Sequence, residues 1–119
     1  MKKADPTDLR VRTKDYALRI IRLFAALPRN DISEILGKQL LRSGTSVGAQ
    51  YREAYRAKSN ADFISKIEGA LQELDETDYW LELLIGAGVF SESKLSALQR
   101  ETSELISIFV TIVKKAKSR

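Results

Sequence analysis

Apolar side chains recur at every third or fourth position along most of this chain, the spacing that places them on one face of an α-helix. Residues that break helices are few and fall in three places, so the segments between them are long. The first predicted helix begins at Thr7 or Leu9 and ends at Leu27, because Pro28 follows and the residue before a proline disfavours helical backbone.

The second predicted helix begins at Asn30 or Asp31, with Ser33 as a later alternative, and continues to about Ala57. Its middle, Ser43–Gly48, is poor helix material, because each glycine costs about 1 kcal/mol relative to alanine. We still predict helix there, since small residues allow a neighbouring helix to approach closely.

The third predicted helix is capped by Ser59 or Asn60 and ends at about Ile85, before Gly86–Gly88, where a glycine can adopt the left-handed conformation that stops many helices. Ser91 is the predicted cap of the fourth helix, which has the most regular pattern in the chain. Its seam alternates steps of three and four: Leu95, Leu98, Thr102, Leu105, Phe109, Ile112 and Ala116.

Short connections between long helices force neighbours in sequence to pack antiparallel. The pattern therefore predicts an all-α fold, an antiparallel up-down-up-down four-helix bundle, as a single domain over residues 1–119. We expect the first six to eight residues and Lys117–Arg119 to be loose.

The chain has 119 residues with no cysteine and no histidine. These absences exclude disulfides and thiolate zinc sites, and they remove the commonest general base. We therefore expect no metal site, no cofactor and no enzyme. No apolar run approaches the roughly 20 residues that span a bilayer, and no signal-peptide core follows Met1, so we expect a cytoplasmic protein without membrane contact.

The net charge of +4 hides a strong segregation along the chain. Residues 1–58 carry a net charge of +7, residues 59–104 carry −7 and residues 105–119 carry +4. Basic surfaces attract polyanions without sequence preference. The candidate residues for contacts with RNA or DNA, which we expect to merge into one basic zone, are Arg12, Arg19, Arg22, Lys114, Lys115 and Lys117. As an alternative, cations at the end of the fourth helix merely complement its dipole.

The third helix becomes apolar nearly all round between Tyr79 and Ile85, and one core cannot bury every side chain of such a window. A second apolar stripe formed by Tyr79, Trp80 and Leu83 is our candidate oligomer interface, since exposed aromatic patches mark interfaces. The alternative is that a broad bundle face buries them all.

A polar line runs along the second helix in steps of three and four: Gln39, Arg42, Ser46, Gln50 and Glu53. The third helix offers Glu73 and Glu76, and a pair between Arg42 and either carboxylate would satisfy a partly buried guanidinium. We interpret the line as an interface or interhelical network. The alternatives are a plain solvent face and a catalytic or ligand site.

Four stretches between Leu36 and Leu84 carry a resemblance to a known family, namely Gly37–Ala49, Tyr51–Ala54, Asp62–Ile67 and Leu71–Thr77. They resemble the small four-helix-bundle proteins named for intervening sequences in 23S rRNA genes, also called S23-like. One departure is Gln50, where many members carry asparagine.

This resemblance implies a homopentameric ring without assigned activity. It also implies a distant relationship to accessory proteins of diversity-generating retroelements, basic pentamers that bind nucleic acid and a reverse transcriptase. On the family pattern, Arg42, Ser46, Gln50 and Glu53 serve structure or assembly.

The leading hypothesis is a non-enzymatic homo-oligomer with nonspecific affinity for RNA or DNA. The alternative is a protein-protein adaptor that binds no nucleic acid. A third hypothesis, the weakest, is an enzyme that uses the carboxylates of Glu53, Glu73 and Glu76.

Overall fold

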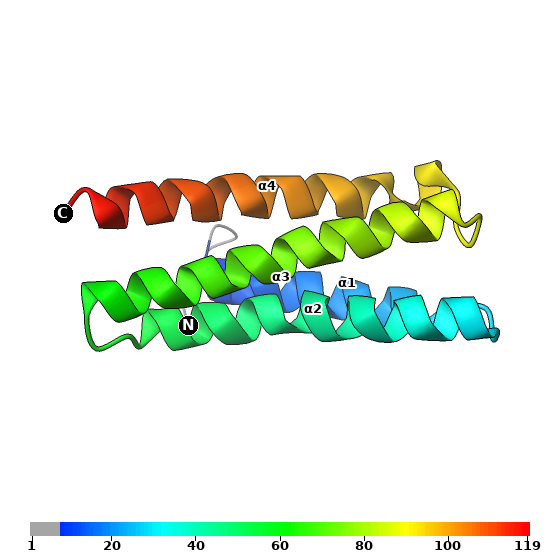
Figure 1. Cartoon of the computed structure of the whole chain (residues 1–119), viewed down its shortest axis with the longest axis horizontal. Helices are drawn as coiled ribbons and strands as arrows, with labels where there is room; N and C mark the ends of the chain where they lie inside the picture. The colour runs from blue at the N-terminus through cyan, green and yellow to red at the C-terminus, as the bar shows by residue number, and fades with distance from the viewer. Residues whose placement is uncertain (1–7) are drawn as a thin grey trace, which may run out of the picture.

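The computed structural model describes residues 8–119, which form four α-helices joined by short connections (Figure 1). The helices are α1 (Leu9–Ala25), α2 (Asp31–Tyr55), α3 (Asn60–Gly86) and α4 (Glu92–Lys117). Consecutive helices run antiparallel and pack on one another, α1 on α2, α2 on α3 and α3 on α4. The prediction of an all-α up-down-up-down bundle is confirmed.

Each helix begins at a polar side chain that accepts a hydrogen bond from a backbone N–H of the first turn. The four capping residues are Asp8, Asn30, Ser59 and Ser91. Each of them satisfies one of the backbone donors that a helix leaves without a partner at its start. Asn30 and Ser59 are thus the caps among the predicted alternatives, whereas Thr7 lies outside the described residues.

Two helices end earlier than predicted. α1 stops at Ala25 instead of Leu27, because Pro28 disfavours helical backbone in the residue that precedes it and the chain must turn before α2. α2 stops at Tyr55 instead of Ala57, since the next cap, Ser59, needs an extended backbone.

Local hydrogen bonds and one glycine determine where α3 and α4 end. Gly88, with φ of 75°, adopts the left-handed conformation that was expected of a glycine there. α4 includes Lys117, and the N–H of Ser118 donates to the carbonyl oxygens of Lys114 and Lys115, so the first of the residues expected to be loose is helical. The expectation of a loose start falls mostly on residues outside the described part of the chain.

The bundle core is built from the predicted apolar faces of all four helices. Its largest fully buried apolar side chains are Tyr16, Ile20, Leu40, Ile67, Leu74, Leu81, Leu84, Leu95, Leu105 and Phe109. The prediction was wrong at one position of the α4 seam. Ile112 is only half-buried, and Val113 is the core residue of that turn. The seam shifts by one residue because a helix has 3.6 residues per turn, which a strict alternation of threes and fours follows only approximately.

Two pairs of buried hydroxyl groups cross the core between helices. The hydroxyl oxygen of Tyr16 on α1 lies 2.7 Å from Oγ1 of Thr102 on α4. Oγ of Ser43 on α2 lies 2.8 Å from Oγ1 of Thr77 on α3. Both threonines donate their single proton to the carbonyl four residues earlier, so Tyr16 and Ser43 are the donors in these pairs. The hydroxyls are therefore satisfied without water, and the pairs fix which residues face each other.

The glycines of α2 allow α1 to approach closely, as expected from the small residues there. A Cβ atom added at Gly44 would lie 2.7 Å from Cγ1 of Ile20, and one at Gly48 would lie 3.1 Å from Oγ1 of Thr13. Any larger side chain would push α1 away, which explains how a helix with poor intrinsic propensity is stabilised by packing.

Candidate functional site

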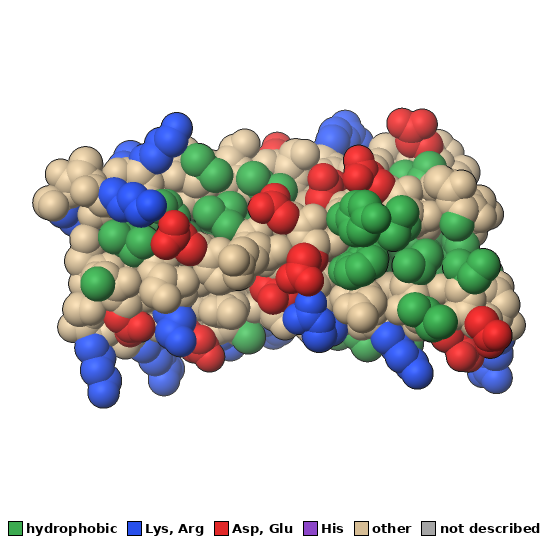
Figure 2. Space-filling view, in the orientation of Figure 1, with side chains coloured by type: hydrophobic (Ala, Val, Ile, Leu, Met, Phe, Trp, Pro, Cys, Tyr) green, Lys and Arg blue, Asp and Glu red, His purple; other side chains and the backbone are tan. Residues whose placement is uncertain are grey.

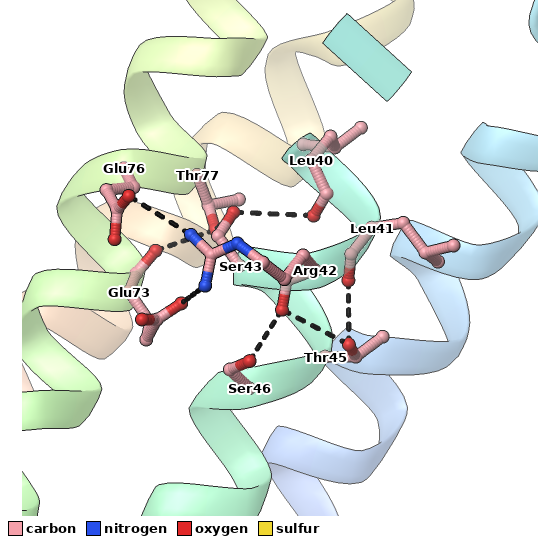
Figure 3. A network of polar contacts seen from close by, with 9 residues as sticks. All are labelled: Leu40, Leu41, Arg42, Ser43, Thr45, Ser46, Glu73, Glu76 and Thr77. Carbon is pink, nitrogen blue, oxygen red and sulfur yellow. Dashed lines mark hydrogen bonds and ion pairs between the residues drawn. The ribbon is translucent and has the colours of Figure 1, made fainter. Parts of the chain in front are cut away.

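Arg42 lies at the centre of a polar network on the surface shared by α2 and α3 (Figure 3). Its guanidinium forms ion pairs with Glu73 at 3.2 Å and with Glu76 at 3.1 Å. The side chain of Glu73 is 14% exposed, whereas that of Arg42 is 51% exposed. The arginine therefore holds two carboxylates along the outer edge of the helix pair, and it is more open to solvent than the sequence led us to expect.

The remainder of the polar line has other partners. Ser46 donates to the carbonyl of Arg42, one turn earlier in α2, at 2.6 Å. The amide of Gln50 covers Gly69 of α3, where an added Cβ would lie 2.9 Å from the amide oxygen. Glu53 pairs with Lys66 at 3.3 Å, and Gln39 is exposed. Most of the line thus serves contacts between α2 and α3.

The three carboxylates considered for catalysis do not form one site. Glu73 and Glu76 pair with Arg42, while Glu53 pairs with Lys66 toward the other end of α2. Within residues 8–119, no group of three metal-binding side chains converges. Glu73 and Glu76 therefore share Arg42, and Glu53 belongs to a separate contact.

The stripe on α2 that carries the polar line becomes apolar toward the start of the helix. Counting back from Gln39 in steps of four and three reaches Ile35 and Ile32, which are 64% and 59% exposed. This continuation could have been read from the sequence by extending the same spacing. It shows that one helix face combines a polar half with an apolar half.

Tyr79, Trp80 and Leu83 of α3 lie near this apolar half. The contact between Ser43 and Thr77 sets the antiparallel register, so the first part of α2 runs beside the last part of α3. Tyr79 is 53% exposed, while Trp80 and Leu83 are half-buried. We call Ile32, Ile35, Tyr79 and Leu83, with Trp80, the α2/α3 apolar patch. Figure 2 shows hydrophobic side chains gathered over this half of the face, beside charged side chains near its middle.

The Trp80 side chain is half-buried. Its ring packs against the core residues and lies at 5.3 Å from the ring of Tyr79, yet its Nε1 donor is buried without a hydrogen-bond partner in the described residues. A buried unpaired donor is unfavourable. Trp80 therefore belongs partly to the core, and Ile32, Ile35 and Tyr79 are the more exposed residues of the patch.

A second apolar surface lies on α1 and was missed from the sequence. Leu18 and Ile21 are 37% and 44% exposed. At 100° per residue they point away from the buried side of α1, which is marked by Tyr16 and Ile20. Because α1 lies behind α2 and α3 in Figure 1, this α1 apolar patch is on the opposite side of the molecule from the α2/α3 apolar patch.

The predicted basic residues of α1 differ in their availability. The guanidinium of Arg12 donates bidentate hydrogen bonds of 2.7 and 2.9 Å to the carboxylate of Glu101 and a third, of 3.2 Å, to Glu104. Its hydrogen bond holds the pKa of the Glu101 carboxyl below its usual range. The guanidinium of Arg12 thus links α1 to α4 through these two carboxylates. Arg19 and Arg22 instead line a groove that also contains Lys94.

The basic residues at the end of α4 lie elsewhere. Lys114 and Lys115 are exposed, and Lys117 pairs with Glu68 at 3.3 Å. Arg19 and Arg22 lie beside Leu98 and Lys94, about 16 to 20 residues earlier in α4, which is roughly 24 to 30 Å at 1.5 Å per residue. The expectation of one merged basic zone was therefore wrong, because α4 extends well beyond the level of Arg19.

A groove lies between the start of α1 and the end of α2, and Glu53 is the one sequence-predicted candidate among its described lining residues. It has a volume of about 810 Å³ and is lined by two carboxylates, four cations and an exposed aromatic ring, namely Asp8, Glu53, Arg10, Lys14, Arg52, Arg56 and Tyr55, together with Val11. We call it the α1/α2 basic groove. The pairs Arg10/Lys14 and Arg52/Arg56 are each four residues apart, so each pair shares a helix face, and this was the signal present in the sequence.

No helix in the described residues is both long enough and apolar enough to cross a membrane. The fold and these surfaces define a small antiparallel four-helix-bundle protein whose accessible chemistry is an apolar patch on each side and a basic groove at one end.

The sequence profile of the 23S rRNA-intervening sequence protein family matches residues 7–111, and the chain belongs to this family. A crystal structure from Bacteroides thetaiotaomicron VPI-5482, of a protein with unknown function from the S23 ribosomal protein family, is similar with a TM-score of 0.84. The two sequences are 38% identical over 89% of this chain and 98% of that chain. No curated protein matches the chain.

Proposed function

We propose that this protein is a non-enzymatic, cytoplasmic homo-oligomer that binds nucleic acid through basic surfaces. The observation that carries the assembly is the α2/α3 apolar patch, whose residues Ile32, Ile35 and Tyr79 are each more than half exposed. Contiguous exposed apolar surface on a small protein marks an interaction site. A homopentamer is the assembly that the resemblance implies.

A ring with cyclic symmetry places one face of each subunit against a different face of the next. The chain offers two such faces, the α2/α3 apolar patch and the α1 apolar patch, on opposite sides of the bundle. A symmetric dimer would use only one of them. The presence of both therefore favours a ring.

Light scattering tests the assembly, with a mass near five times 13.4 kDa as the expected result for the wild type. The double variants Ile35→Asp/Tyr79→Asp and Leu18→Asp/Ile21→Asp should each be monomeric, because each loses one of the two faces. These positions are preferable to Trp80, whose ring also packs on the core. Thr111→Asp, an exposed position on α4, is the matched control.

Mixing the two double variants distinguishes a ring from a symmetric dimer. Each variant retains the face that the other lacks, so an equimolar mixture should form dimers. A wild type of 13.4 kDa would contradict self-assembly. An α1 double variant that keeps the wild-type mass would contradict the two-face ring.

Nucleic-acid binding is supported by the exposed cations Arg22, Lys114 and Lys115 and by the α1/α2 basic groove. Filter binding of mixed RNA and DNA at increasing salt should show retention that falls steeply with ionic strength. No retention at low salt would leave the alternative, a protein-protein adaptor. A reverse transcriptase is the protein partner that the distant family relationship implies.

A further inference from the structure

The α1/α2 basic groove brings four cations together around an exposed aromatic ring. Arg10 and Lys14 come from α1, Arg52 comes from the last turn of α2, and Arg56 directly follows that helix. The groove lies at the end of the bundle where α1 begins and α2 ends, so it is distinct from both apolar patches.

The two carboxylates of the groove are already engaged. Asp8 accepts hydrogen bonds from the side chain of Arg10 at 3.0 and 3.3 Å, which lower the pKa of its carboxyl, and Glu53 pairs with Lys66 at 3.3 Å. Within residues 8–119, no ion pair joins Lys14, Arg52 or Arg56 to a carboxylate. As far as the described residues go, Lys14, Arg52 and Arg56 are thus available to an anion.

An aromatic ring lies among these cations. Tyr55 is 57% exposed, and the guanidinium carbon of Arg10 lies 4.4 Å from the centroid of its ring. This cation–π contact orients the ring, while more than half of the residue stays open to solvent. A tyrosine exposed to this degree at the last residue of a helix adds little to the core.

Free cations beside an exposed aromatic ring fit a ligand that carries both phosphate groups and unstacked bases. We propose that the α1/α2 basic groove binds single-stranded nucleic acid, with phosphates at Lys14, Arg52 and Arg56 and a base stacked on Tyr55. This inference rests on the nucleic-acid binding proposed above and assigns it a location and a preference for single strands. A duplex cannot present a base to Tyr55, because its bases are stacked on one another.

Arg52 and Arg56 also lie at the end of α2, where cations complement the helix dipole. If Arg52 and Arg56 only complemented the helix dipole, replacing them would lower the stability of the protein and leave its affinity for nucleic acid unchanged. The experiment therefore measures binding and thermal unfolding on the same variants.

The binding experiment uses fluorescence anisotropy of a labelled oligouridylate, the corresponding oligodeoxythymidylate and a duplex RNA, titrated with the full chain at several salt concentrations. In Arg52→Gln/Arg56→Gln, the affinity for both single strands should fall more than tenfold. The slope of log affinity against log salt should become shallower by about 1.4, or about 0.7 for each phosphate that the variant no longer neutralises. Lys38→Gln/Arg100→Gln removes the same charge at exposed positions outside the groove and should leave that slope within about half a unit of the wild type.

Tyr55→Leu separates stacking from charge. It should lower single-strand affinity about tenfold without changing the salt slope and should leave duplex affinity unchanged. The three side chains changed at the end of α2 are exposed, so the thermal midpoints should stay close to that of the wild type.

The outcomes of this experiment separate the two proposals. If the wild type binds oligouridylate but the groove variants bind it equally well, the groove assignment is wrong while nucleic-acid binding stands. Duplex RNA bound as tightly as the single strand would also overturn the inference. If the wild type binds none of the probes at low salt, both proposals about nucleic acid fail.

Discussion

At the scale of single residues, this protein uses its few buried or half-buried polar groups to join helices. Arg12 is the clearest example, because its guanidinium contacts two carboxylates of α4 that lie three residues apart. The sequence placed Arg12 correctly on α1, but it did not reveal that α4 would bring Glu101 within 2.7 Å. A pair separated by 89 residues is set by packing, which local spacing does not encode.

We predict that Glu101→Gln destabilises the bundle at neutral pH by about 0.5 to 1 kcal/mol, the upper part of the range for surface ion pairs, because the side chains of Arg12 and Glu101 are only 25% and 15% exposed. Because the pKa of Glu101 is lowered in the folded state, its stabilising effect is complete above about pH 4.5, the ordinary value for this carboxyl. The effect is lost as the pH falls through the lower folded pKa. Wild type and variant should therefore converge in stability in acid.

Urea unfolding at a fixed protein concentration, repeated from neutral to acidic pH, measures this difference. Glu104→Gln is the matched control, since Glu104 is 66% exposed and makes a single 3.2 Å contact with the same arginine. We expect a smaller loss for the control. A difference between wild type and Glu101→Gln that stays constant with pH would contradict the assignment.

At the scale of helices, the hydrophobic pattern and the caps were informative, whereas some helix ends were not. Asn30, Ser59 and Ser91 cap their helices by accepting a local hydrogen bond, which depends only on neighbouring residues. The ends of α1 and α2 fall two residues short of the predicted positions, because the chain must turn into the next helix. The middle of α2 is helical for a tertiary reason, the close approach of α1.

We predict that Gly44→Ala destabilises the protein by about 1 kcal/mol, even though alanine favours helix. A Cβ at this position would lie within 3.0 Å of three atoms of the fully buried Ile20. Overpacking of this kind costs about 1 to 3 kcal/mol, and the gain in helix propensity offsets about 1 kcal/mol of it.

The matched control is Gly86→Ala, because a Cβ at Gly86 would meet no atom within 4 Å. Thermal and urea unfolding should show a change below about 0.5 kcal/mol for this control. If Gly44→Ala proved as stable as Gly86→Ala, the contact between α1 and α2 would be looser than described.

At the scale of the whole molecule, apolar side chains remain exposed on two opposite sides after the core is complete. The sequence indicated the surplus on α3 through Tyr79, and the spacing of the polar line leads back to Ile35 and Ile32, but only the register of α2 against α3 brings these isoleucines beside the end of α3. The basic residues show the same limit, since Arg12 is neutralised in the fold while Arg52 and Arg56 gather with Lys14 in one groove.

We predict that the thermal midpoint of the wild type rises with protein concentration, because association stabilises only the folded chain. The double variant Ile35→Asp/Tyr79→Asp should lose this dependence. Differential scanning calorimetry over a wide range of concentrations provides the measurement, with Thr111→Asp retaining the wild-type behaviour. A midpoint of the wild type that is independent of concentration would argue against self-association.

The sequence by itself determined the all-α class, the order and approximate extent of four helices and most of the core, because these depend on periodicity and on bonds between near neighbours. Only the tertiary structure decided which charges are neutralised, which apolar residues stay exposed and where cations from different helices meet. Those properties depend on the register and rotation of one helix against another, which distant contacts such as Ser43 to Thr77 and Tyr16 to Thr102 fix.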